Sequence, residues 1–151
     1  MTIRSVALVT VIGTLALGGG AALGASAKPA PTKLANPTKT CEQLNSRFLT
    51  GLAPGQNAKL ANFLSSAFII QRSDGTGSSW PAYLEDHGIY TDWSTQVLRA
   101  QFSTPVITCL ANSTGTQQFP NSTTARIALK SLTTYAWQRG AWRITSFARF
   151  G

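Results

Sequence analysis

The chain has 151 residues, 43% of them hydrophobic, and a formal net charge of +8 at pH 7. Once a leader is removed, this length suits one domain with a single core and is too short for two. One histidine and two cysteines cannot make a zinc site, and the scattered acids lack calcium-loop spacing, so we predict no metal and no cofactor.

The N-terminal residues have the composition of a secretory signal peptide. Arg4 is the only charge before Lys28, an apolar run follows it, and the Ala-Ser-Ala sequence at 25–27 offers a small-x-small cleavage site. An uncleaved membrane anchor is the alternative, but the Gly-Gly-Gly run at 18–20 weakens a spanning helix. We therefore expect residues 1–27 to be cleaved and the mature protein to be soluble and secreted or extracytoplasmic.

A linker and three short helices come next. Residues 28–40 are rich in Pro, Ala, Thr and Lys without an apolar period, which is typical of a flexible linker. The folded domain is then expected over residues 41–151. Capping residues and apolar stripes predict helices from Thr40 to Gly51, from about Asn57 to Ser66, and from Ser79 to His87, with a strand at 67–72 between the last two.

After Gly88 the chain becomes rich in strands. Alternating and β-branched residues predict strands over residues 97–102, 106–112, 124–137 and 142–150. Helices followed by strands of this kind are typical of an α+β fold. We expect a strongly curved antiparallel sheet that wraps around the N-terminal helices and leaves a cavity at its open end.

The last two strands predict one long hairpin, from Leu129 to Phe150, with its tip at Arg139 and Gly140. An uninterrupted register places one set of side chains on a single face, where they would line a ligand pocket. This set consists of Trp137, Trp142, Tyr135, Ile144, Thr133, Ser146, Ser131, Leu129 and Phe150. The walls would suit a small apolar or amphipathic ligand, although aromatic residues at alternating positions also suit a packed core.

The same register gives the hairpin a basic outer face. Lys130, Arg143 and Arg149 share this face with Leu132 and Phe147, and no acid follows Asp92 in the chain. Such a face would attract an anionic cell-surface polymer or an acidic partner, or form a homodimer through the sheet. A solvated face that keeps the protein soluble is the alternative. We expect no nucleic acid, because export removes most of it and no RNA-binding signature is present.

The two cysteines predict a disulfide. In an oxidising compartment an even pair is most often bonded, and Cys41 with Cys109 is the one pairing available. Two buried, inert thiols are the alternative, since a sequence does not give the distance between them.

Three segments, FIIQRSDGTG, SSWPAYLED and SLTTYAWQRGAWRITSFARF, resemble the cone-shaped nuclear transport factor 2-like superfamily. This superfamily includes polyketide cyclase (SnoaL-like) and ketosteroid isomerase-like domains, and the likeness extends over nearly all of residues 41–150. For the enzymes among its members, the resemblance implies a pocket carboxylate as base and a Tyr or second acid that stabilises the developing oxyanion.

The acids of this chain do not favour such chemistry. Only Asp92 stands where the sheet begins, so Asp92 with Tyr90 or Tyr135 is the remaining candidate pair, and a loop aspartate is the simpler interpretation. His87 follows a helix, where a partly positive imidazole suits the helix dipole. We therefore predict no catalytic residue and a secreted, non-catalytic small-molecule or partner-binding domain. The alternatives are a SnoaL-like or ketosteroid isomerase-like enzyme that acts on a small apolar substrate, and a docking module that uses Leu132, Phe147 and the basic face.

Overall fold

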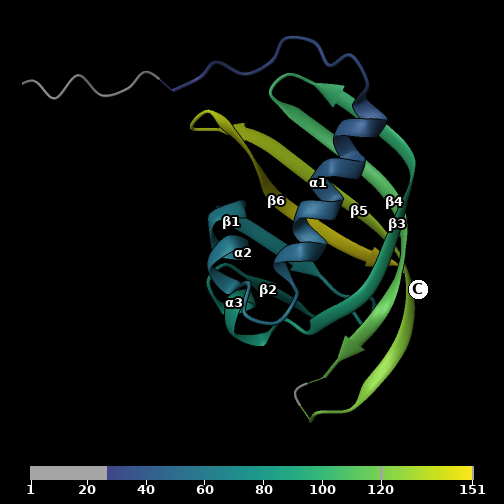
Figure 1. The fold of residues 1–151 in the computed structure, drawn as a ribbon. Helices are drawn as coiled ribbons and strands as arrows, with labels where there is room; N and C mark the ends of the chain where they lie inside the picture. The colour runs from purple at the N-terminus through teal and green to yellow at the C-terminus, as the bar shows by residue number, and fades with distance from the viewer. Residues whose placement is uncertain (1–26, 120, 151) are drawn as a thin grey trace, which may run out of the picture.

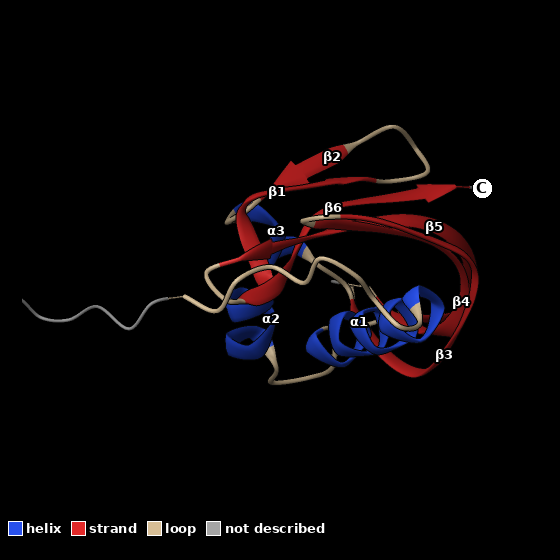
Figure 2. Ribbon diagram, turned by 90° about the horizontal axis from the view of Figure 1, so that it is seen from above, coloured by secondary structure: helices blue, strands red, loops and turns tan. Residues whose placement is uncertain are grey.

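The fold is a curved sheet, and the longest helix of the protein lies on the inner side of that sheet. The structure, a computed structural model, describes residues 27–119 and 121–150. Its helices and strands are α1 (Pro37–Gly51), α2 (Asn57–Phe63), β1 (Leu64–Gln71), β2 (Gly77–Ser79), α3 (Ala82–Asp86), β3 (Ile89–Ser103), β4 (Val106–Gln118), β5 (Thr124–Gln138) and β6 (Ala141–Phe150). The long strands β3 to β6 bend around α1, with α2 and α3 beside it (Figures 1 and 2). The predicted α+β cone is confirmed.

The sheet is mixed, whereas the sequence predicted a wholly antiparallel one. Its strand order is β2-β1-β6-β5-β4-β3, and the pair β1 and β6 is parallel. These two strands lie far apart in the sequence, so no short hairpin forces them to run in opposite directions. Among the described residues, no helix is long and apolar enough to cross a membrane.

The first helix begins earlier than predicted. Asn36 caps α1, because its side chain accepts a hydrogen bond from the backbone N–H of Lys39 at 2.9 Å, and Pro37 suits the first helical position. Residues 37–40 are therefore helical and do not belong to a linker. The preceding residues contact the sheet, since the carbonyl oxygen of Lys28 accepts a hydrogen bond from the indole of Trp137 at 2.9 Å. The predicted signal peptide lies outside the described residues, except for its last residue, and stays a prediction.

The second helix ends earlier than predicted. It stops at Phe63, and β1 starts at Leu64, directly beside Ile144 of β6. The apolar spacing of Leu60, Phe63 and Leu64 fits a helix, but all three are buried here with Leu64 already in the strand. Pairing with β6 outweighs the local helical pattern at this position.

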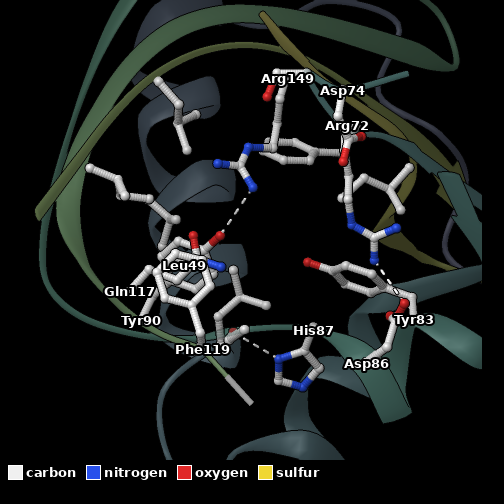
Figure 3. Close-up of a pocket in the computed structure, with 17 residues that line it drawn as sticks. Leu49, Arg72, Asp74, Tyr83, Asp86, His87, Tyr90, Gln117, Phe119 and Arg149 are labelled. Carbon is white, nitrogen blue, oxygen red and sulfur yellow. Dashed lines mark hydrogen bonds and ion pairs between the residues drawn. The ribbon is translucent and has the colours of Figure 1, made fainter. Parts of the chain in front are cut away.

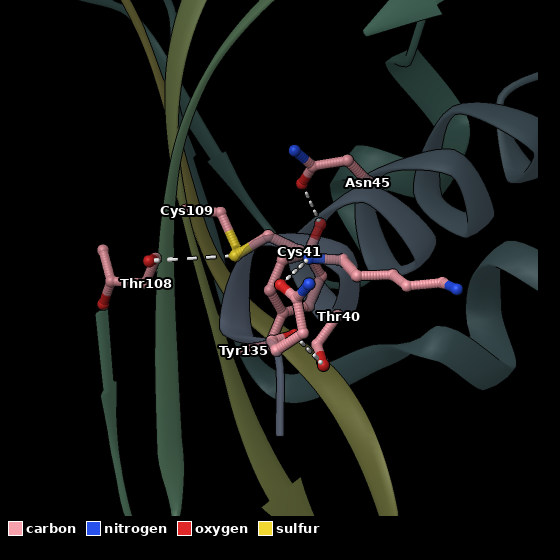
Figure 4. The surroundings of a disulfide bond; sticks show 8 residues. Thr40, Cys41, Asn45, Thr108, Cys109 and Tyr135 are labelled. Carbon is pink, nitrogen blue, oxygen red and sulfur yellow. Dashed lines mark hydrogen bonds between the residues drawn. A yellow bond between two sulfur atoms is a disulfide. The ribbon is translucent and has the colours of Figure 1, made fainter. Parts of the chain in front are cut away.

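The predicted disulfide between Cys41 and Cys109 is confirmed. It joins α1 to β4 with a distance of 5.7 Å between the Cα atoms, and both residues are fully buried (Figure 4). One turn further along α1, Asn45 accepts a hydrogen bond from the hydroxyl of Tyr135 at 2.7 Å. These contacts fix α1 against the middle of the sheet.

The hairpin between β5 and β6 follows the predicted register only near its tip. Trp137 pairs with Trp142 and Tyr135 with Ile144, as predicted, but a β-bulge follows on β6. Beyond the bulge the pairing shifts by one residue, so that Thr133 pairs with Phe147. Bulges of this kind accommodate the bending of a strongly curved sheet. The side chains that follow on β6 therefore face opposite to the prediction.

Candidate functional site

A cavity of about 350 Å³ opens inside the cone, between the far end of the hairpin and the short elements β1 and α3. Its walls are largely apolar and consist of Leu49, Leu52, Ile70, Phe119, Ile127, Leu129 and Phe147. Its polar lining consists of Arg72, Ser73, Asp74, Tyr83, Asp86, His87, Gly88, Tyr90, Gln117 and Arg149. Apolar walls with a few convergent polar groups are typical of a small-molecule site.

Arg149 comes from the last strand and points into this cavity. Because the bulge shifts the strand by one residue, Arg149 faces the inner side, as Phe147 does. Figure 3 shows the Arg149 side chain at the cavity. One terminal nitrogen of its guanidinium donates a long hydrogen bond, 3.4 Å, to the hydroxyl of Tyr90. Its Nε atom is buried and has no hydrogen-bond partner in the described part of the chain. No carboxylate of the described residues forms an ion pair with it.

Arg72, the second guanidinium at the cavity, is neutralised. It forms an ion pair with Asp86 at 2.8 Å, and Ser78 bonds to both partners. The Asp86 carboxylate is therefore held on the rim by two donors and is about half exposed, 49%. It is not placed as a free base inside the cavity.

Two tyrosines supply hydroxyl groups to the cavity. Tyr83 and Tyr90 are 4% and 8% exposed, and Figure 3 shows the hydroxyl of Tyr83 directed toward the middle of the cavity. Burial raises the pKa of Tyr83 far above its ordinary value. Burial also raises the pKa of Tyr90, although the nearby Arg149 opposes that shift. Both phenols therefore stay protonated at neutral pH and can donate hydrogen bonds.

His87 lies at the cavity wall, but both of its ring nitrogens lie next to oxygen atoms of the protein. Nδ1 is 3.0 Å from the carbonyl oxygen of Gly88, and Nε2 is 3.0 Å from the side-chain oxygen of Asn57. A general base needs a ring nitrogen that faces the substrate. His87 instead ties the start of α2 to the start of β3.

Neither of the two remaining candidate acids, Asp92 and Asp74, offers a free carboxylate to the cavity. Asp92 is exposed and lies within β3, not in a loop, where it adopts a left-handed conformation with φ of 48° at an irregularity of the strand. Its backbone oxygen, and not its carboxylate, accepts a hydrogen bond from Arg126. Asp74 belongs to a turn, where Thr76 donates to it through its hydroxyl and its backbone N–H. The hydroxyl bond is the main reason why the pKa of Asp74 lies below its ordinary value.

The predicted pocket residues separate into several groups, and most of them lie outside the cavity. Leu129 lines it, while Ser131 and Thr133 border a small adjoining void beside Asn45. Tyr135 and Ile144 are fully buried in the core, and the rings of Trp137 and Trp142 pack edge to face with centroids 5.4 Å apart. Ser146 and Phe150 follow the bulge and face away from the cavity, and Phe150 is 45% exposed. The cavity lining therefore includes none of Trp137, Trp142, Tyr135, Ile144, Ser146 and Phe150.

The predicted basic face does not exist as a cluster. Lys130 is exposed on the outer side, but Arg149 is inside the cavity and Arg143 donates to the backbone oxygen of Asn62. Phe147, assigned to the same outer face, is 8% exposed and packs on Phe48 with ring centroids 5.1 Å apart. The bulge is the physical reason for Phe147 and Arg149, since a shift of one residue reverses every later side chain, whereas Arg143 precedes the bulge and keeps its predicted pairing with Ala136.

Sequence reasoning missed Arg72, Tyr83 and Arg149, which give the cavity its polar character. Tyr83 was read only as part of a short helix, and Arg72 only as the end of a strand. Trp142 faces inward, and Arg149 on the same strand faces inward only because a single bulge lies between them. Nothing in the local sequence marks that bulge.

The fold and the cavity define a class: α+β proteins in which a curved, unclosed sheet encloses a pocket next to a long helix. No protein-family model and no curated protein matches the sequence. Solved structures do match. A nuclear transport factor 2-like protein from Cytophaga hutchinsonii is similar with a TM-score of 0.68 and 9% identity, over 77% of this chain and 98% of that one. The chain therefore has the nuclear transport factor 2-like fold.

Other matches carry different descriptions. A putative Ca/calmodulin-dependent kinase II association domain from Exiguobacterium sibiricum has a TM-score of 0.65 and 13% identity, over 78% of this chain and 96% of that one. A ketosteroid isomerase-like protein from Erwinia carotovora atroseptica has a TM-score of 0.60 and 11% identity, over 78% of this chain and 97% of that one. At these identities the likeness concerns the fold alone, because one fold serves many unrelated functions.

Proposed function

We propose that the mature protein is an exported, non-catalytic domain that binds a small molecule in its cone cavity. The observation that carries this proposal is a partly open, mostly apolar cavity that is lined by an arginine and two tyrosines. Buried polar groups that lack a protein partner are costly unless something else satisfies them. A bound molecule would satisfy them.

The positions of the acids support a binding role over catalysis. All five acids of the chain lie in the described part: Glu42, Glu85 and Asp92 are exposed, Asp86 is paired with an arginine, and Asp74 is bonded within a turn. An isomerase-like mechanism needs a carboxylate base next to the substrate. The cavity has no such group free for proton transfer.

The disulfide supports the exported location. Stable structural disulfides form in oxidising compartments and are uncommon in a reducing cytosol. Cys41 and Cys109 are both fully buried in the bond, which matches the predicted signal peptide. N-terminal sequencing of exported material tests this, with Lys28 expected as the first residue.

The SnoaL-like or ketosteroid isomerase-like enzyme is the second candidate, because Asp86, Tyr83 and His87 all line one cavity. It requires Asp86 to leave Arg72 when a substrate binds. The variant Asp86→Asn distinguishes the binding domain from the enzyme. If the protein is a binding domain, Asp86→Asn should still bind the ligand. If folded Asp86→Asn loses the turnover of an identified substrate, that result would support the enzyme.

A pair of matched substitutions on β5 tests the proposed function. Leu129→Trp fills the cavity, and Leu132→Trp makes the same change on the outer face, where Leu132 is 38% exposed. Protein isolated from its exporting host would be extracted, and bound small molecules identified by mass spectrometry. We expect a molecule in the wild type and in Leu132→Trp but not in Leu129→Trp. Equal contents in both variants, or an empty wild type, would contradict the proposal.

A further inference from the structure

The cavity holds one positive charge that nothing in the described chain neutralises. The charged or titratable groups around it are Arg72, Asp74, Asp86, His87, Arg149 and the two tyrosines, Tyr83 and Tyr90, which stay neutral. The ion pair at 2.8 Å accounts for Arg72 and Asp86, and Asp74 is directed to its own turn. The two ring nitrogens of His87 lie 3.0 Å from neutral oxygen atoms of Gly88 and Asn57, so His87 supplies no negative charge. Of the two arginines at the cavity, Arg149 alone stays without a counter-charge.

The donors of the cavity converge in a way that suits an oxygen anion. The buried Nε–H of Arg149 has no acceptor among the described residues, and guanidinium groups bind carboxylates through two parallel N–H bonds. Tyr90 accepts from Arg149 at 3.4 Å, which leaves its own hydroxyl proton free to donate. The hydroxyl of Tyr83 is a second donor and is directed toward the middle of the cavity (Figure 3).

From this geometry we propose that the ligand is a small amphipathic monocarboxylate, with its carboxylate on Arg149 and the hydroxyls of Tyr83 and Tyr90 and its chain along Leu49 and Leu129. This inference deepens the proposed function and rests on it. A single uncompensated cation matches a single negative charge, whereas a phosphate group with nearly two charges would leave an excess negative charge in an apolar space. A volume of about 350 Å³ is at the small end of ligand sites, which favours a short chain.

Hexanoate and its neutral analogue hexanamide test the charge requirement by calorimetric titration at neutral pH. The variant Arg149→Gln removes the cavity charge. Arg99→Gln is the matched control, since Arg99 is exposed on β3 and its loss changes the net charge equally. We expect hexanoate to bind the wild type and Arg99→Gln alike, and to bind Arg149→Gln about ten- to a hundredfold more weakly. Hexanamide should bind the wild type more weakly than hexanoate does.

Two further measurements keep the test valid if Arg149→Gln does not fold. In the wild type, the NMR signal of the Arg149 Nε–H should shift on saturation with hexanoate, because this proton gains an acceptor. Arg149→Lys keeps the charge but loses the two-bond geometry, so it should retain hexanoate binding at reduced affinity. An unchanged Nε–H signal at saturation would overturn the assignment.

The outcomes separate the inference from the proposed function. Equal affinity for hexanoate and hexanamide, with no effect of Arg149→Gln, would overturn the monocarboxylate and leave a neutral-ligand cavity. Tighter binding of hexyl phosphate than of hexanoate would overturn it in favour of a dianion. If neither six-carbon probe binds, the monocarboxylate inference fails, and the extraction of Leu129→Trp and Leu132→Trp decides separately whether the cavity holds another molecule.

Discussion

The two halves of the last hairpin differ in what they do, although they belong to the same two strands. In the packed half, residues 135–144, Tyr135 and Ile144 are fully buried and the two tryptophans pack edge to face. In the hollow half, residues 127–133 and 146–150, the same inner face lines a cavity and presents Arg149. The bulge between them marks the change. One extra residue thus separates a core from a binding site.

The disulfide, which lies where the two halves meet, is expected to have the largest effect on stability. Cys109 lies next to Thr133 on β5, and the bond closes a loop with a sequence separation of 68 residues. The double variant Cys41→Ala with Cys109→Ala should lower the free energy of unfolding by about 4 kcal/mol on the chain-entropy model. Urea denaturation measures it, with the wild type as reference. A loss within about 0.5 kcal/mol, as for a surface substitution, would contradict the structural role.

A matched pair of truncations compares the two halves directly. Ile144→Ala removes a fully buried side chain from the packed half, and Ile127→Ala removes a half-buried one from the cavity wall. The first should destabilise the fold by about 3–4 kcal/mol through the void it leaves. The second should cost about 1 kcal/mol, because its neighbours are already separated by the cavity. Thermal and urea unfolding of both variants measure these losses of unfolding free energy. Equal losses in the two variants would mean that the hollow half is packed as well as the other half.

The hydrogen bond between Tyr135 and Asn45 gives a smaller effect within the packed half. Tyr135→Phe keeps the ring but leaves the side-chain oxygen of Asn45, which is 5% exposed, without its 2.7 Å donor. We expect a loss of about 1–2 kcal/mol in unfolding free energy. The double variant with Asn45→Leu removes both polar groups, and it should recover part of the loss. No recovery would mean that the ring position, and not the unpaired oxygen, causes the effect.

The smallest effect is expected at the turn on the cavity rim, where a substitution should change the pKa of Asp74. Thr76→Val removes the hydroxyl that donates to Asp74 at 2.6 Å, so the lowered pKa of Asp74 should rise toward its ordinary value of 3.8. The stabilisation from this bond is present above the unfolded-state pKa and is lost as the pH falls through the folded-state pKa. Carboxyl NMR titration measures the shift. Thr123→Val alters the equivalent turn at Asn121 and should leave the Asp74 titration unchanged.

The sequence predicted the fold better than the site, for a physical reason. Hydrophobic periodicity, turn residues and the cysteine pair are local signals, and they predicted the α+β cone, the hairpin tip and the disulfide correctly. The register of a strand depends on the curvature of the whole sheet, which no local pattern specifies. Phe147 and Arg149 were placed on the outer face, and Ser146 and Phe150 in the pocket, because the tip register was extrapolated through the bulge. Trp137, Trp142 and Ile144 keep their predicted register, but they pack as core and do not line the cavity. The cavity also needs β1 beside β6, a contact between distant parts of the chain.

The position of Phe147 tests the central claim, that the bulge turns the end of β6 inward and places Arg149 in the cavity. Phe147 faces the same way as Arg149, and its ring lies 5.1 Å from that of Phe48 on α1. We predict strong nuclear Overhauser effects between the ring protons of Phe147 and Phe48, and none between Phe147 and the methyl groups of Leu132. Contacts of Phe147 with Leu132 and none with Phe48 would show an uninterrupted hairpin, with Arg149 outside and the cavity without its cation.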